Sequence, residues 1–305
     1  TLSSWKREFI ISKRHRQRKE VQDKQMMKRR LKRYLPQLPG DILKIIVMVI
    51  FAFPFYWMVI TSFKPYFETI QIPPTLWPHD FTLDNLKEIF TGANNILQYA
   101  FNSIVVTVSV VVIQALVMIP AAYAFATREF PLKKLMFGMV LIAFMIPEQI
   151  TYISVYLMFS KAQMIDSLWP QILPFGANAF GIFMLRQSFK QVNGELFEAA
   201  RMDNAGEWKI MMKVALPICR PTLIATMMLS VISIWNSYFW PLVMTNDDKF
   251  RPLTLYVEKL KQDVEQGLQW NMIMAGNMIL VVPIIIIYCF GSKQIIKAFT
   301  YNGVK

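Results

Sequence analysis

Charged residues are scarce in this chain, and they are unevenly distributed. They make up 17% of its 305 residues, whereas about a quarter of the residues in a soluble domain are charged. Long apolar stretches without charge alternate with short charged ones. This pattern places most of the chain in lipid rather than around a soluble core.

Cysteine and histidine are also rare. Cys219 and Cys289 form no CxxC pair, and His15 and His79 are isolated. Neither a disulfide framework nor a metal site is therefore predicted. The sequence has no GxxxxGK[ST] phosphate loop, and no Ser/His/Asp set or pair of carboxylates in a catalytic context. We expect a chain that is not an enzyme, does not hydrolyse ATP and binds no cofactor itself.

Six apolar runs have roughly the twenty residues that a helix needs to cross a bilayer. They are Ile42–Phe63, Tyr99–Ala126, Leu135–Phe159, Leu168–Leu185, Thr222–Thr245 and Trp270–Phe290. Prolines inside these runs are expected to kink the helices rather than end them, because neighbouring helices satisfy the freed carbonyls. The sequence predicts an all-α membrane protein with six transmembrane helices in residues 41–305.

Basic residues predict the orientation. With the N-terminus in the cytoplasm, 26 Lys and Arg lie inside and 7 outside, so both termini are predicted to be cytoplasmic. Residues 1–40 form a basic tail with thirteen Lys and Arg against three acids. We expect this tail to lie near anionic lipid and not to bind nucleic acid, because the aromatic residues lie mainly in the apolar runs. No cleavable signal peptide is expected, because the first apolar run is too long.

Three loops are long enough to carry structure. Two are predicted outside, at about 64–98 and 246–269, and residues 82–90 of the first favour a short, capped amphipathic helix. The third, cytoplasmic at about 186–221, has two helical patterns, Glu195–Asp203 and Glu207–Ala215, with a break at residues 204–206. A nine-residue helix is unstable alone in water, so something must pack against it.

The cytoplasmic loop contains a spaced motif. Glu198, Ala199 and Ala200 begin it, and Leu216-Pro217 closes it. The motif resembles the EAA signature of ABC importer permeases. The chain is similar to the carbohydrate-uptake branch, which includes the smaller permease of the maltose importer, and TSFKP at 61–65, WNSYFWP at 235–241 and NGVK at 302–305 add to the resemblance. The usual glycine of the signature is replaced by Asn204, the non-glycine residue that best tolerates a left-handed backbone.

The resemblance implies a type I ABC importer permease fold and a set of partners. The expected partners are a second permease in a heterodimer, two ATPase subunits that bind ATP and Mg, an extracytoplasmic solute-binding protein, and a sugar or glycan, in the cell membrane of a prokaryote. It also implies that the loop is a coupling helix that docks in a groove of the ATPase. The residues carried over to that role are Glu198, Ala199, Ala200, Asp203, Asn204, Gly206, Leu216 and Pro217.

Candidates for the substrate path come from polar and aromatic residues inside the apolar runs. Glu148 is either a hydroxyl acceptor or gate, because ionisable residues in membranes are functional by default, or a paired or protonated carboxyl. Trp235, Asn236, Tyr238 and Trp240 suit a glycan, or form an interfacial aromatic belt. Asn178 is a further candidate.

Other functions remain open at this point. Within the ABC class, the cargo is alternatively a polyamine, an amino acid or glycerol phosphate. A secondary transporter needs inverted repeats and ion-binding residues at the midplane, and the sequence has no repeat and only one acid inside a predicted helix. A membrane scaffold leaves the motif in the cytoplasmic loop unexplained.

Overall fold

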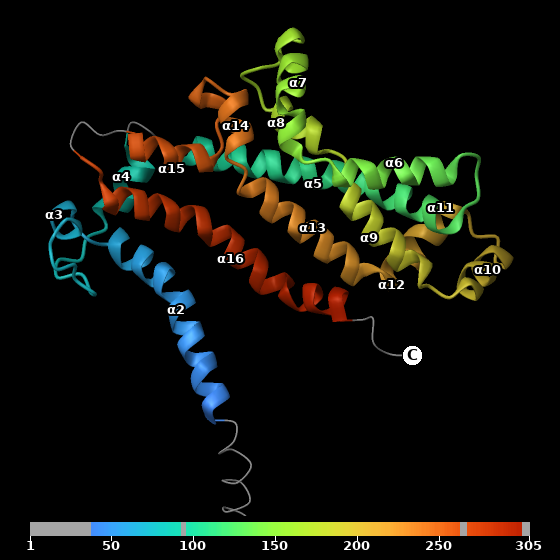
Figure 1. The fold of residues 1–305 in the computed structure, drawn as a ribbon, viewed down its shortest axis with the longest axis horizontal. Helices are drawn as coiled ribbons and strands as arrows, with labels where there is room; N and C mark the ends of the chain where they lie inside the picture. The colour runs from blue at the N-terminus through green and yellow to red at the C-terminus, as the bar shows by residue number, and fades with distance from the viewer. Residues whose placement is uncertain (1–37, 93–95, 263–266, 301–305) are drawn as a thin grey trace, which may run out of the picture. The chain divides into compact units, whose positions relative to one another are not determined.

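The computed structural model describes residues 38–92, 96–262 and 267–300, and within these ranges every regular element is helical (Figure 1). The chain divides into two compact units, residues 1–57 and 58–305. The first unit contributes the part of α2 that ends at Trp57. The predicted basic tail, 1–40, lies almost wholly outside the described residues.

Three long helices match predicted apolar runs. They are α2 (Leu38–Ser62), α5 (Ile96–Thr127) and α16 (Trp270–Thr300). Each has one proline in its interior, Pro54, Pro120 or Pro283, and continues through it. The prediction that prolines are tolerated inside helices is confirmed for these three.

The third predicted run, Leu135–Phe159, is not one helix. It divides into α6 (Lys133–Met145) and α7 (Glu148–Lys161), which meet at a bend of 98°. Proline disfavours the helical conformation for the residue before it, and Ile146 is extended while Pro147 caps α7. The prediction of a single helix was wrong because this proline starts a new helix.

The fourth and fifth predicted runs are also divided. The fourth, Leu168–Leu185, forms α8 (Trp169–Ile172), η1 (Leu173–Phe175) and α9 (Ala179–Lys190). The fifth, Thr222–Thr245, forms α13 (Arg220–Trp235) and α14 (Phe239–Met244). Both predictions of single helices were wrong. In the fourth run, Pro174 begins the tight turn of η1, and Asn178 then starts α9 by accepting a hydrogen bond from the Gly181 backbone N–H at 2.8 Å.

Fewer than six uninterrupted helices are therefore long enough to cross a membrane. Among the described residues, three helices are long and apolar enough to cross a membrane, and up to five if each bent pair counts as one span. The second bent pair joins residues 207–218 to α13 at 83°. The chain is a multi-pass membrane protein by this measure.

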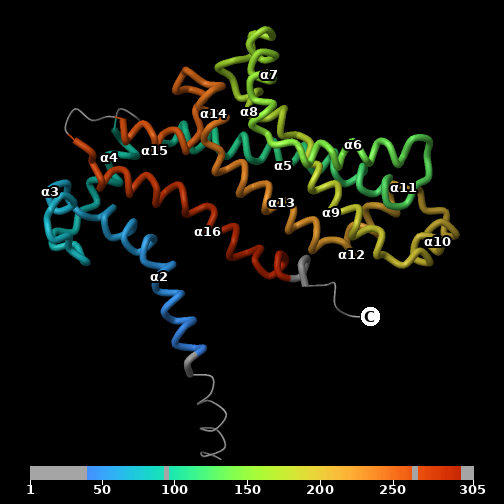
Figure 2. The backbone as a smooth tube through the Cα atoms, viewed as in Figure 1, coloured from blue at the N-terminus to red at the C-terminus, as the bar shows by residue number. Residues whose placement is uncertain are grey.

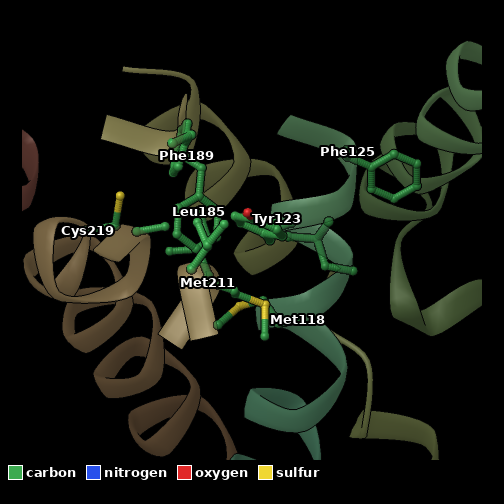
Figure 3. Packing of buried hydrophobic residues seen from close by; sticks show 12 residues of the cluster. Met118, Tyr123, Phe125, Leu185, Phe189, Met211 and Cys219 are labelled. Carbon is green, nitrogen blue, oxygen red and sulfur yellow. The ribbon is translucent and has the colours of Figure 1, made fainter. Parts of the chain in front are cut away.

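The second unit is built around α5. This helix packs on α9, α13 and α15, and α13 packs on α16 (Figure 1). One cluster of buried side chains lies where the C-terminal part of α5 meets α9 and residues 197–219, and Figure 3 shows Tyr123, Leu185 and Met211 in it. A second cluster lies toward the other end of α5 and includes Tyr99 and Tyr256. Packed side chains thus hold α5 to its neighbours near both of its ends.

The first loop predicted to lie outside begins at the end of α2 and contains α3 (Tyr66–Thr69) and α4 (Asp84–Thr91). The predicted short helix is confirmed as α4, but the predicted cap is not, because the N-cap residue is Leu83 and it makes no side-chain capping bond. Thr82 Oγ1 instead accepts from the Asp84 N–H at 3.1 Å, just before the helix. Buried Asn85 donates to the Ser62 carbonyl at 2.8 Å and ties α4 to the end of α2.

The second loop predicted to lie outside contains η3 (Asp248–Phe250) and α15 (Leu253–Gln262). Lys259 Nζ donates to Asp248 Oδ2 at 2.5 Å, and Arg251 pairs with Asp248 Oδ1 at 2.7 Å. Burial opposes ionisation of Asp248, but these cations outweigh it and lower the pKa of its carboxyl. The ionic cluster therefore fixes η3 against α15.

Candidate functional site

The predicted cytoplasmic loop folds into a chain of short helices. They are α10 (Gly194–Met202), α11 (Glu207–Ile210), the π-helix η2 (Met211–Ala215) and α12 (Leu216–Ile218). Figure 2 shows the chain running from α9 through these elements into α13. The two predicted helical patterns and the break between them are confirmed.

α10 is anchored on one side and open on the other. Asn193 caps it by accepting from the Glu195 N–H at 3.1 Å. Buried Phe197 packs edge-on against the Tyr123 ring of α5, with ring centroids 6.2 Å apart. Glu198 and Ala199 are exposed. The helix is therefore held to the bundle by an aromatic contact while its carboxylate and a small residue face outward.

The surface beside the motif is unusually apolar for a loop. Met202 and Trp208 are 83% and 66% exposed, and Leu196 is 46% exposed. Ala200 is half-buried, whereas Asp203 is exposed. Exposed apolar groups next to a small-residue motif are typical of a surface that docks another protein.

Asn204 makes the turn between α10 and α11. Its φ is +54°, in the left-handed region, as its replacement of glycine predicted. Its N–H donates to the Arg201 carbonyl at 3.0 Å. Gly206 has an extended backbone, with φ −65° and ψ 153°, and caps α11. The left-handed turn thus rests on Asn204, and Gly206 does not share it.

Glu207 joins three elements at this turn. Its Oε2 accepts a hydrogen bond from the Tyr123 hydroxyl of α5 at 2.8 Å. Its Oε1 pairs with Arg201 Nε of α10 at 3.1 Å and with Arg128, which follows α5. One carboxylate therefore ties the loop to the end of α5, an arrangement that the sequence motif alone did not reveal.

Leu216 and Pro217 lie at a corner. Pro217 has no N–H to donate to the carbonyl four residues earlier, and the turn before it is the wide π-helix η2. Cys219 then breaks the helix, and α13 leaves at 83° to residues 207–218. π-Helical turns are frequent at functional sites.

A cleft of about 1080 Å³ lies in the bundle, lined by α5, α6, α7, η1, α9 and α13, with Trp240 of α14. Its neutral polar lining residues are Gln114, Thr151, Tyr152, Asn178, Ser230 and Ser233. Glu148 also lines it. The cleft brings residues from seven helical elements to one surface.

Two comparisons decide the family. The model of the binding-protein-dependent transport system inner membrane component family matches residues 118–296, more than half of the chain. The arabinooligosaccharides transport system permease protein AraQ of Halalkalibacterium halodurans is 30% identical over 261 residues, covering 85% of this chain and 93% of the relative. The chain belongs to this family of transport permeases.

Further relatives and solved structures agree. The sn-glycerol-3-phosphate transport system permease protein UgpE of Brucella abortus (strain 2308) is 28% identical over 271 residues, covering 87% of this permease and 96% of the relative. A crystal structure of a bacterial ABC transporter involved in the import of the acidic polysaccharide alginate contains a similar chain. Its TM-score is 0.76 at 23% identity, over 84% of this permease and 95% of that chain. The permease fold is thereby established, and the chain is a transport subunit rather than an enzyme.

The structure of the permease brings together only some of the predicted substrate-path residues. Glu148 lines the cleft, but as the first residue of α7 rather than in the interior of a helix. Asn178 lines it while capping α9, and its Nδ2 donates to Ser230 Oγ at 2.9 Å. Trp240 lines it with its indole N–H bonded to the Pro170 carbonyl at 2.7 Å.

The other aromatic candidates lie elsewhere in the permease. Trp235 is buried, and its indole N–H donates to the Leu280 carbonyl of α16 at 3.0 Å. Neither Asn236 nor Tyr238 is among the described residues that line the cleft. Gln114 and Tyr152 do line it and were not predicted. The signal that points to them is a polar side chain within an apolar run.

Proposed function

We propose that this permease is the membrane subunit of an ATP-driven, binding-protein-dependent importer of a sugar or oligosaccharide. The observation that carries the proposal is the structure of the loop from α10 to α12. Its helix α10 bears the motif with Glu198 exposed, and the loop is bonded to α5 through Glu207 of α11. The printed functions of AraQ and of the alginate transporter support a saccharide cargo.

The proposed topology has six crossings with both termini in the cytoplasm of a prokaryote. The 26-to-7 distribution of Lys and Arg supports it. Three crossings correspond to α2, α5 and α16, and a fourth to the bent pair of α6 and α7. The fifth is α13, because residues 207–218 of the second bent pair belong to the proposed cytoplasmic loop. The sixth is the broken stretch from α8 to α9, because irregular backbone is tolerated at membrane depth where it lines a cavity.

The proposed mechanism is alternating access driven from the cytoplasmic side. A binding protein delivers the cargo to the outer face, and a second permease completes the path. Two ATPase subunits bind ATP and Mg, and their closure moves α10 of this permease. Ala199 and Ala200 allow close approach, and Glu198 offers a carboxylate to the ATPase. Asn204 makes the turn that follows Asp203, and Gly206 caps α11. Leu216 and Pro217 set the corner through which the movement reaches α13.

The experiment that tests this function is a detergent pull-down from the native host, with mass spectrometry of the proteins that co-purify. We expect a second permease, an ATPase and a solute-binding protein. Reconstitution of that complex should then give uptake only with ATP. A chain that purifies alone or as a homo-oligomer and transports in liposomes without ATP contradicts the proposal and revives a secondary transporter.

A second cargo class has an observation in its favour. The UgpE relatives, at 28% identity, carry the printed function of sn-glycerol-3-phosphate transport. Uptake of sn-glycerol 3-phosphate by the reconstituted complex distinguishes this alternative from a saccharide.

A further inference from the structure

The charge of the cleft distinguishes between these cargo classes. Among the described residues that line it there is no Lys, Arg or His, and Glu148 is the one ionisable acid. Sites for phosphate and carboxylate groups generally supply Arg, Lys or backbone N–H groups. Here the formal charge on this wall of the path has the same sign as a phosphate or a uronate.

No cation on α7 compensates for Glu148. The basic residue of that helix is Lys161, at its other end. Thirteen residues of helix separate the two, roughly 20 Å along the axis, which is beyond the screening length of about 8 Å at physiological salt. Arg186 of α9 is already engaged, with its guanidinium 3.9 Å from the Phe137 ring centroid and its Nε bonded to the Phe125 carbonyl.

The remaining surface of the cleft suits the rings and hydroxyls of a sugar. The Tyr152 ring stacks on Phe239 at 5.3 Å and lies 5.1 Å from the Trp240 ring. Phe144 and Phe180, both lining residues, stack at 5.4 Å. Apolar and aromatic walls with a few fixed polar groups are the usual composition of a pocket for an uncharged organic ligand.

Gln114 adds an unsatisfied acceptor to this wall. Its Nε2 donates to the Phe175 carbonyl at 2.8 Å, whereas its buried Oε1 has no hydrogen-bond partner among the described residues. Buried polar atoms normally have a partner. A hydroxyl that reaches this buried oxygen can donate to it, and such hydroxyls are present on neutral sugars, on sn-glycerol 3-phosphate and on alginate alike. Gln114 therefore suits a hydroxyl-bearing cargo, and the discrimination against anions rests on the charge of the cleft.

We infer that the cargo of this permease is an uncharged oligosaccharide, that the aromatic and amide wall of the cleft contacts it, and that Glu148 selects against anionic solutes. The inference rests on the proposed importer function and deepens it. The cleft has a volume of about 1080 Å³, which exceeds the roughly 300–1,000 Å³ of pockets that hold drug-sized ligands. A three-carbon phosphate such as sn-glycerol 3-phosphate requires less space than this. A polyamine fits less well, because one carboxylate neutralises only one of its amines.

The test is uptake by the whole importer in liposomes with ATP inside. The probes are a neutral arabino-oligosaccharide, sn-glycerol 3-phosphate, an alginate oligosaccharide and spermidine. We expect the neutral probe to enter at least about tenfold faster than the charged ones, a ratio that a few contacts can supply. Faster uptake of either anion or of spermidine overturns the inference but leaves the importer function standing. If no probe enters in an ATP-dependent way, the importer function itself fails.

Variants separate the role of Glu148 from that of the binding protein. In Glu148→Gln, measured with the same binding protein, the ratio of neutral to anionic uptake should fall severalfold. Glu129→Gln is the matched control, since Glu129 is an exposed acid paired with Lys133 and lies outside the described cleft lining. A ratio that stays the same in Glu148→Gln, or that falls equally in the control, overturns the assignment of selectivity to Glu148.

Discussion

Replacement of Glu207 by Gln tests whether this carboxylate holds the proposed coupling loop, residues 194–218, against α5. The substitution keeps the shape but removes the charge that holds Arg201 and Arg128, and it weakens the bond from Tyr123. The ion-paired side chains are about 40% exposed, so each ion pair contributes only about 0.2–1 kcal/mol. The hydrogen bond from Tyr123 to the charged carboxylate adds to this, reduced because the site is partly open to solvent. The total stabilising free energy that Glu207→Gln removes is then roughly 2 kcal/mol.

A loss of this size changes the docking equilibrium of α10 by about 30-fold. Hydrogen exchange of the backbone amides of residues 194–202 measures it directly. We expect these amides to exchange faster in Glu207→Gln and not in Glu258→Gln, which removes one ion pair to Lys261 in α15. We also expect less uptake per ATP hydrolysed. Unchanged protection of α10 would refute this role of Glu207.

Three further perturbations have defined outcomes. Glu198→Lys should abolish stimulated ATP hydrolysis and uptake while the melting temperature stays the same, because Glu198 is exposed; wild-type uptake would contradict the coupling role. Asn204→Val should destabilise the turn by about 1–2 kcal/mol in thermal unfolding, because a β-branched residue is strained at φ +54°, whereas Asn204→Gly should be tolerated. Burial opposes ionisation of Asp248, but Lys259 and Arg251 lower its pKa below the usual 3.8. Its stabilisation is therefore present above that pH and lost as the pH falls through the lowered value. Asp248→Asn should lower stability by about 0.2–1 kcal/mol at pH 7, and the difference from wild type should shrink in strong acid; a pH-independent difference would argue against the ion pair.

Continuous helices were predictable from the sequence, and broken ones were not. Pro120 and Pro147 both lie in apolar runs, yet α5 continues through the first and α6 ends before the second. The difference lies in the local sequence and the packing. Glu148 directly follows Pro147, and an acid in the first turn favours a helix start. The part of α5 around Pro120 is instead held by its neighbours in a buried cluster.

In the candidate site, features that depend on one residue were predictable from the sequence, whereas contacts between residues far apart in the sequence were not. The left-handed turn at Asn204 was predictable because it depends on one residue type. The bond from Tyr123 to Glu207 joins residues 84 positions apart, and no spacing rule indicates it. The roles of Trp235 and Trp240 also depend on distant carbonyls, at Leu280 and Pro170, so an aromatic cluster in the sequence did not reveal which indole faces the cleft.

In the proposed mechanism, the corner at Cys219 converts a movement of the loop into a rotation of α13. α13 has 16 residues and is therefore about 24 Å long. Since it leaves at 83° to residues 207–218, a push on the short arm turns the long one rather than sliding it. A rotation of about 10° at the corner displaces the far end of a helix of that length by about 4 Å. Ser230 and Ser233 lie near that end and line the cleft. Under the proposed mechanism, a small movement at the loop therefore gives a larger movement of this wall of the cleft.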